Sequence, residues 1–193
     1  TAANVFGVAL NKVTSEQRSK AKMVSYGLAY GMEAYGLAQR LAIGVSEASE
    51  ILDAYFKAFP RVKKYMDETV EEARKRGYTE TLFGRRRTIP ELQNPNFRIR
   101  QIGERQAMNS GIQGLAADIF KVALVRIDSA LEVGKFDSQL VLQVHDEVIL
   151  EASAGEEVAV EKLVRDTMCS AAKLSVSLEV NLAWGDTWAS AKS

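Results

Sequence analysis

The sequence is poor in cysteine, histidine and proline, which number one, one and three among 193 residues. Because Cys169 is alone, it cannot form an internal disulfide, and because His145 is the only histidine, no Cys and His cluster can form a structural zinc site. No stretch reaches eighteen apolar residues, and the first residues show neither a basic leader before an apolar run nor an initiating Met. We therefore expect a cytoplasmic protein without membrane contact, and a truncated chain.

The net charge of zero conceals an asymmetry along the chain. Residues 1–113 contain 18 Lys and Arg against 12 Asp and Glu, a balance of +6, and residues 114–193 contain 7 against 13, a balance of −6. A basic portion favours contact with phosphates and an acidic portion favours divalent cations, although both portions are also compatible with solvated surfaces that attract each other. With 47% hydrophobic residues, the chain has enough apolar material for one large domain or two small ones.

Hydrophobic periodicity and capping signals predict a helix-rich α+β fold with a small antiparallel sheet. The two glycines Gly111 and Gly114 leave open whether the longest helical run is one helix or two. Two hairpins are expected, and a polar tail should follow a last strand. The expected helices span residues 15–31, 33–43, 46–58, 61–76, 97–133 and 156–173, and the expected strands span residues 78–83, 85–89, 140–144, 148–150 and 178–184.

The first long helix carries a stripe of side chains that recur every four residues, namely Arg18, Lys22, Tyr26 and Tyr30. The two cations precede the two aromatics, which is the order that a nucleoside triphosphate requires, with charge for its phosphates and flat apolar surface for its sugar and base. Gly27 and Gly31 would permit close approach of a sugar, a base or a neighbouring backbone. The alternative is a surface helix with its cations outward and its tyrosines packed inward.

A second group of polar residues is expected at the tip of the later hairpin. Asp146 and Glu147 place two hard oxygen donors on a tight turn, which suits a magnesium ion that keeps waters and phosphates among its ligands. The imidazole of His145 is better suited to donate a hydrogen bond to a phosphate or to a primer-terminal oxygen than to bind the metal. Two-metal phosphoryl transfer needs a further carboxylate, so this hairpin offers half a site. The alternative is an ordinary acidic turn.

A third pattern lies on the long helical run, where Arg105, Asn109 and Gln113 form a polar ladder with a spacing of four. Minor-groove acceptors are similar for every base pair, so these side chains would check base-pair geometry without reading sequence. The alternative is a helix face that packs against polar neighbours.

Three segments together resemble family A DNA polymerases, the bacterial DNA polymerase I type, over essentially the whole chain. Residues 18–31 are similar to the family's fingers helix, residues 104–118 to its palm helix, and residues 143–147 to its carboxylate hairpin. The resemblance implies a fingers subdomain at residues 1–100 and the C-terminal part of the palm at residues 101–193. It also implies that the upstream palm, the thumb and any exonuclease domain lie outside the chain, and that the protein associates with the bacterial nucleoid.

The resemblance assigns roles to the residues of the stripe. Arg18 and Lys22 would hold the incoming deoxynucleoside triphosphate and neutralise the leaving pyrophosphate, the ring of Tyr26 beside Gly27 would pack on its sugar, and Tyr30 would guard the template-base position. Many relatives have Phe where this chain has Tyr26, and in the family a Tyr there accompanies acceptance of nucleotides that lack the 3′-hydroxyl. We therefore predict weak discrimination against dideoxynucleotides.

The other two motifs receive roles in the same way. Arg105, Asn109 and Gln113 would touch the minor groove of the primer-template DNA, and His145 would lie near the primer end. Asp146 would bind catalytic Mg²⁺ with assistance from Glu147, and a second metal-binding aspartate is expected upstream of this chain. The nearby Asp137 is interpreted as an ordinary turn residue. This sequence departs from the family at Ser110-Gly111, where Ala-Pro is usual, and at Leu115, where Ser or Thr is usual.

The resemblance implies template-directed DNA synthesis, in which the primer 3′-hydroxyl attacks the α-phosphate with the help of two magnesium ions. We expect little activity from this segment without the upstream portion of the same polymerase. Two other classes remain compatible with the residues, a non-catalytic nucleic-acid-binding module and a magnesium-dependent phosphohydrolase.

Overall fold

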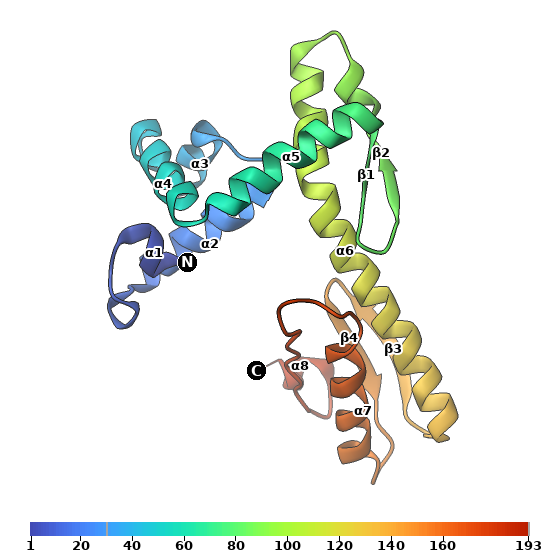
Figure 1. The fold of residues 1–193 in the computed structure, drawn as a ribbon. Helices are drawn as coiled ribbons and strands as arrows, with labels where there is room; N and C mark the ends of the chain where they lie inside the picture. The colour runs from blue at the N-terminus through green and yellow to red at the C-terminus, as the bar shows by residue number, and fades with distance from the viewer. Residues whose placement is uncertain (30, 193) are drawn as a thin grey trace. The chain divides into compact units, whose positions relative to one another are not determined.

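The computed structural model describes residues 1–29 and 31–192, which form two compact units (Figure 1). The first unit is Thr1–Leu115 and the second is Ala116–Ser193. Gly114 and Leu115 carry no charge, so the first unit has the balance of +6 and the second that of −6. Helices together with small antiparallel sheets confirm the predicted α+β class. None of the helices in the described ranges has the length and apolar character needed to cross a bilayer.

The first unit begins with a set of helices packed around one core. These elements are α1 (Ala2–Phe6), the 3₁₀ helix η1 (Leu10–Lys12), α2 (Ser15–Ala29), α3 (Ala34–Leu41), α4 (Val45–Ala58) and α5 (Pro60–Arg76). Helix α2 begins where the sequence predicts, because Thr14 and Gln17 each accept a backbone N–H from the other, at 3.1 and 3.0 Å. Helix α5 has proline in its first turn and ends at Arg76 before the C-cap Gly77 with φ 78°, in agreement with the helix expected at residues 61–76.

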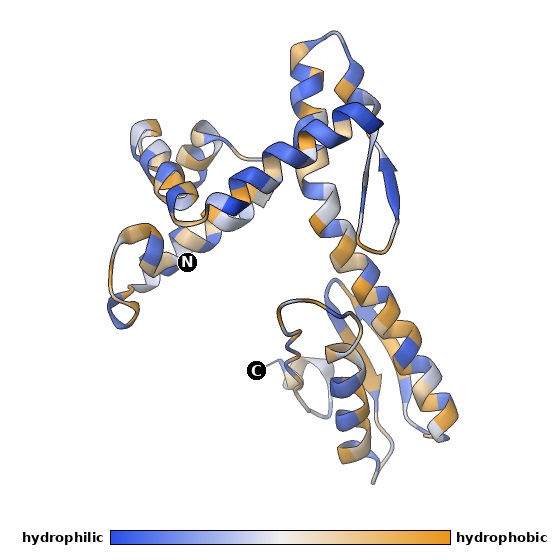
Figure 2. Ribbon diagram, in the orientation of Figure 1, coloured by the Kyte–Doolittle hydropathy of each residue, from blue (hydrophilic) through white to orange (hydrophobic). Residues whose placement is uncertain are grey.

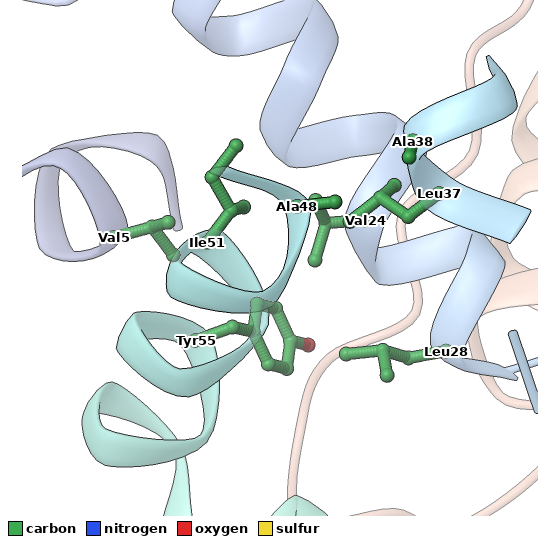
Figure 3. Packing of buried hydrophobic residues seen from close by; sticks show 8 residues of the cluster. All are labelled: Val5, Val24, Leu28, Leu37, Ala38, Ala48, Ile51 and Tyr55. Atoms are coloured by element: carbon green, nitrogen blue, oxygen red, sulfur yellow. The ribbon is translucent and has the colours of Figure 1, made fainter. Parts of the chain in front are cut away.

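The core of these helices is formed by residues that α1, α2, α3 and α4 each turn inward (Figure 3). The ring of Tyr55 belongs to it and lies 5.0 Å from that of Phe59 between centroids. In contrast, α5 is hydrophilic along most of its length (Figure 2) and carries ion pairs between successive turns. The buried core residues are Val5, Val24, Leu28, Leu37, Ala38, Ala48, Ile51 and Tyr55.

A hairpin and a long helix complete the first unit. Strands β1 (Tyr78–Glu80) and β2 (Arg86–Thr88) pair antiparallel, and the 3₁₀ helix η2 (Pro90–Gln93) leads into α6. Helix α6 (Phe97–Gly134) is a single helix of 38 residues, which resolves the alternative between one helix and two. Its glycines serve close packing, because a Cβ at Gly111 would lie 2.8 Å from the Tyr65 hydroxyl, and one at Gly114 would lie 2.7 Å from Cγ2 of Thr81.

The second unit combines the end of α6 with β3 (Gln139–Val144), β4 (Glu147–Glu151), α7 (Glu157–Cys169) and α8 (Trp188–Ala191). Strands β3 and β4 pair antiparallel, with a register irregularity between Leu140 and Leu142. The buried core of this unit joins α6 to α7 and consists of Ile127, Leu131, Val160 and Val164.

The last strand predicted for residues 178–184 is wrong, because the structure assigns no strand to this segment. This segment contacts the core and α7 through side chains and a backbone carbonyl, and it does not pair with another strand. Leu182 packs against the core, Arg165 donates to the carbonyl of Val180 at 3.2 Å, and the Trp184 indole donates to Glu161 at 2.8 Å. The predicted helix at 156–173 is shorter and ends at Cys169, and the expected polar tail includes the short helix α8.

The turn before β3 is held by a carboxylate from the other end of the hairpin. Glu156 accepts hydrogen bonds from the backbone N–H groups of Asp137 and Ser138, at 3.1 and 3.0 Å, and from the Ser138 hydroxyl at 2.6 Å. The hydroxyl bond from Ser138, followed by the two backbone N–H groups, holds the pKa of Glu156 below its usual value against the opposing effect of desolvation. Asp137 lies in a bend, in agreement with its interpretation as a turn residue.

A Glu156→Gln substitution is expected to lower the melting temperature of the chain at pH 7 and to make it less sensitive to acid. Because the pKa of Glu156 is lower in the folded state than in the unfolded one, its stabilising effect is present above the unfolded-state pKa, about 4.5, and is lost as the pH falls through the folded-state pKa. Thermal melts between pH 3 and pH 7 measure this difference. Glu132→Gln in α6 is the control, and identical pH profiles for the two variants would contradict the prediction.

Candidate functional site

The predicted stripe lies on the solvent-exposed side of α2. Arg18 and Lys22 are exposed, and Tyr26 is 58% exposed, whereas Ala21, Val24 and Leu28 form the buried side of the same helix. The alternative in which the tyrosines pack inward is therefore wrong for Tyr26. Tyr30 lies outside the described residues.

The cations of this stripe keep their charge available for a ligand. Within residues 1–29 and 31–192, neither Arg18 nor Lys22 has an ion-pair partner, whereas Lys20 on a neighbouring face pairs with Glu16 at 2.9 Å. The Lys22 ammonium lies 5.7 Å from the centroid of the Tyr26 ring, within the range of a cation–π contact. The stripe thus combines two unneutralised cations with an exposed aromatic ring, an arrangement suited to an anionic ligand that has a flat part.

The two glycines of the stripe are in close contact with other parts of the first unit. Gly27 is buried, and a Cβ there would lie 3.0 Å from the sulfur of Met32. Gly31 has φ 65°, and a Cβ there would overlap Cγ of Arg105. In the structure the close neighbours of these glycines are the side chains of Met32 and Arg105, whereas the sequence predicted a sugar, a base or a neighbouring backbone. The contact at Gly31 places the turn that follows α2 next to Arg105, the first residue of the polar ladder.

The ladder residues differ in exposure. Arg105 and Gln113 are exposed, and the Arg105 Nε donates a long hydrogen bond of 3.4 Å to the carbonyl of Gln101. Asn109 is half-buried, and its Oδ1 is buried without a hydrogen-bond partner among the described residues. A buried acceptor without a donor is costly, and a ligand donor would relieve that cost.

The segment that carries the ladder is held by two arginines of the β1–β2 hairpin, to which the sequence analysis assigned no role. Arg87 donates to the hydroxyl of the buried Ser110 at 3.1 Å, and Arg85 donates to the carbonyl of Gly114 at 2.8 Å. The Ser110 hydroxyl also donates to the carbonyl of Gln106 at 2.5 Å. Ser110, where the family usually has Ala, therefore anchors the hairpin without breaking the helix, and this departure was the available sequence signal.

The acidic tip is a two-residue loop in the second unit. His145 and Asp146 connect the paired residues Val144 and Glu147, and the φ of 54° at His145 is a left-handed conformation that histidine tolerates better than most residues. The amide of Gln143 donates to the His145 carbonyl at 2.8 Å. Both loop side chains are exposed, whereas Glu147 is half-buried. The backbone thus presents the Asp146 carboxylate on a well-held turn.

Sequence reasoning missed a cation beside this tip. The Lys192 ammonium lies 2.9 Å from Oε2 of Glu147, so one of the two predicted metal-binding carboxylates has an ion-pair partner. Across residues 1–29 and 31–192, no group of three or more His, Cys, Asp and Glu side chains is placed to hold a metal ion. The oxygen donors of Asp146 and Glu147 suit Mg²⁺ only if waters, phosphates or other carboxylates complete its coordination.

The stripe residues Arg18, Lys22 and Tyr26 and the ladder belong to the first unit, and the acidic tip belongs to the second. The residues of the tip are His145, Asp146 and Glu147. The geometry of each group is therefore described within its own unit.

Comparison with known proteins gives the same family that the motifs indicate. The model of "DNA polymerase family A" matches residues 1–190. The chain is 50% identical over 187 residues to DNA polymerase I of Mycobacterium tuberculosis strain H37Rv, and 47% identical over 193 residues to that of Streptococcus pneumoniae strain R6. The two alignments cover 97% and 100% of this chain but 21% and 22% of the two relatives. The chain therefore spans about a fifth of the relatives' length.

The solved structures include a similar fold with bound ligands. The POL domain of Pol1 from M. smegmatis, in complex with DNA primer-template and dNTP, aligns with a TM-score of 0.96 at 46% identity and covers 100% of this chain and 34% of that one. The fold, the order of the motifs and the match to the family model over nearly the whole length agree. This chain belongs to DNA polymerase family A.

Proposed function

We propose that this chain provides the nucleotide-binding helix and one half of the metal site for template-directed DNA synthesis, transferring a nucleotidyl group from a dNTP to a primer 3′-hydroxyl. The observation that carries the proposal is the exposed stripe of α2, in which Arg18 and Lys22 lack ion-pair partners among the described residues and Tyr26 faces solvent beside them. In this assignment residues 1–100 act as fingers and residues 101–193 as the C-terminal part of the palm.

The stripe would bind the nucleotide from its phosphates to its base. Arg18 and Lys22 contact the triphosphate, and the charge of Lys22 also neutralises the pyrophosphate as it leaves. The ring of Tyr26 packs on the sugar beside Gly27, and Tyr30 guards the template-base position. The order of cations and aromatic ring along α2 supports these roles, because it follows the order of groups in the ligand.

The acidic tip would hold Mg²⁺ through Asp146, with Glu147 assisting. When bound, two such ions stabilise the attacking and leaving oxygens of phosphoryl transfer, and the second aspartate is supplied from outside this chain. The well-held turn and the exposed Asp146 carboxylate support the assignment, because Mg²⁺ takes few protein ligands and needs room for waters and phosphates. His145 beside it would donate to the primer terminus.

The ladder would contact the minor groove of the primer-template DNA. Arg105 and Gln113 are exposed on α6, and the Oδ1 of Asn109, which has no hydrogen-bond partner within residues 1–29 and 31–192, would accept from a donor on the nucleic acid. The contact between Gly31 and Arg105 supports a joint role, because it links the nucleotide helix to the DNA-contacting helix.

The chain would act together with an upstream portion of the same polymerase. It spans about a fifth of the curated relatives' length, and on β3 the apolar side chains of Val141 and Leu142 are 44% and 47% exposed. Such a surface on a small sheet favours coverage by further protein.

The proposal is tested in a polymerase chimaera, in which this chain replaces the 187-residue stretch that it matches in the Mycobacterium tuberculosis relative. We expect primer extension that requires Mg²⁺ and selects the dNTP complementary to the template. Salt-sensitive DNA binding without extension and without a metal effect would favour the non-catalytic nucleic-acid-binding module. Hydrolysis of free dNTP without a primer would favour the phosphohydrolase, and either result would refute the proposal.

Lys22→Ala in this chimaera is expected to weaken use of the incoming dNTP by about tenfold to a hundredfold in kcat/KM, the usual effect of losing one charge-assisted hydrogen bond. Single-nucleotide incorporation kinetics measure it. Lys20→Ala is the matched control, because Lys20 lies on the same helix but is paired with Glu16. Equal losses for the two variants would show that general helix charge, rather than the stripe, binds the triphosphate.

A further inference from the structure

The Lys192 ammonium is held between two partners at the acidic tip. It lies 2.9 Å from Oε2 of Glu147 and 4.7 Å from the centroid of the Trp188 ring. The ion-pair partner Glu147 belongs to β4, and the cation–π partner Trp188 belongs to α8. The ion pair places a positive charge next to Glu147, one of the two carboxylates to which the proposed function assigns the metal.

The short helix α8 positions Lys192. Thr187 and Ser190 form a capping box at the start of α8, with hydrogen bonds of 3.0 and 3.2 Å, and Lys192 is the C-cap of the same helix. A Cβ at Gly185 would overlap the Ser190 hydroxyl, so the segment before α8 folds closely back onto it. The helix therefore fixes the distance from Trp188 to Lys192 and restricts where the ammonium can lie.

The pair is positioned to compete with a divalent cation. A metal ion at Asp146 would gain from the adjacent charge of Glu147, but an ammonium at hydrogen-bond distance neutralises that carboxylate. The side chains of Lys192 and Glu147 are 51% and 43% exposed, and exposed ion pairs are weak. A divalent ion can therefore displace this lysine, whereas it could not readily displace a buried one.

We propose that Lys192 is an internal counter-ion of Glu147 that sets how tightly the acidic tip binds a divalent cation. Lys192 is thus a positioning residue, which acts on the metal through Glu147. The inference rests on the proposed function, because it takes Asp146 and Glu147 as the metal-binding carboxylates. It predicts that removing the ammonium strengthens metal binding, although most substitutions beside a functional site weaken it.

The test is Mn²⁺ binding to the 193-residue chain, measured from the electron paramagnetic resonance signal of free Mn²⁺. Lys192→Met, which retains an apolar stem for Trp188, is expected to bind Mn²⁺ about fivefold more tightly than the wild type, since an exposed ion pair of this kind contributes about that factor. Lys192→Arg keeps the charge and should bind as the wild type does. Circular dichroism of each variant verifies that the helices are retained.

Lys162→Met is the matched control, because it removes the same charge from the second unit at an exposed pair with Asp166 on α7. Unchanged affinity in Lys192→Met, or an equal gain in Lys162→Met, would overturn the inference. Asp146→Asn separates this inference from the proposed function on which it rests. If Asp146→Asn abolishes binding while Lys192→Met has no effect, only the inference fails, whereas wild-type binding by Asp146→Asn would overturn both.

Discussion

Asp146→Asn is expected to lower the rate of nucleotide incorporation by the polymerase chimaera by at least about a hundredfold, the usual scale for losing one strong electrostatic contact to the transition state. Asparagine keeps the size of the side chain and its place in the loop between Val144 and Glu147. It removes the negative charge on which Mg²⁺ binding depends, because an amide oxygen is a weaker ligand than a carboxylate. Rapid-quench kinetics at saturating dNTP and Mg²⁺ measure the rate.

The matched control for this substitution is Asp137→Asn. Asp137 precedes the same hairpin and carries the same charge, but only its backbone N–H is used, in the hydrogen bond to Glu156. We expect this variant to incorporate nucleotides at close to the wild-type rate. If the two variants lose activity equally, the loss reflects the negative charge of the second unit as a whole, and Asp146 is not the metal ligand.

Much of the fold was predictable because the deciding signals are local. The start of α2 depends on Thr14 and Gln17, three residues apart, and the end of α5 depends on Gly77 alone. The prediction of a strand at residues 178–184 failed for a physical reason. An alternation of apolar residues indicates that one face of the segment is buried, but it does not show that a neighbouring strand is present to pair with it. Leu182 packs against the core that includes residues of α7, and the Trp184 indole donates a hydrogen bond to Glu161 of α7.

The candidate site was predictable to the extent that it depends on spacing along one element. A spacing of four residues places Arg18, Lys22 and Tyr26 on the same side of α2. That this side faces solvent follows from the packing of Val24 and Leu28 in the core. The contacts made by Glu156 and Lys192 were not predictable, because each joins residues far apart in the sequence through side chains with many rotamers. The ion pair of Lys192 and Glu147 is of this kind.

Tyr26→Phe is expected to make the polymerase chimaera discriminate against dideoxynucleotides by about tenfold more than the wild type, the factor that corresponds to one hydrogen bond. The two residues differ only in the phenol hydroxyl, just as a dideoxynucleotide differs from a dNTP only in the 3′-hydroxyl. Because Tyr26 is 58% exposed beside Lys22, its hydroxyl is available to the sugar side of a nucleotide bound along the stripe. The polar group of the protein would then replace the one that the dideoxynucleotide lacks.

The measurement is the ratio of kcat/KM for dTTP to that for dideoxy-TTP opposite a template adenine. Tyr35→Phe provides the control, because Tyr35 is also exposed, at 67%, but belongs to α3 and lies outside the stripe. We expect its ratio to equal that of the wild type, while kcat/KM for dTTP changes little in either variant. An unchanged ratio for Tyr26→Phe would mean that the ring does not lie against the sugar, and the direction of the nucleotide along α2 would have to be reassigned.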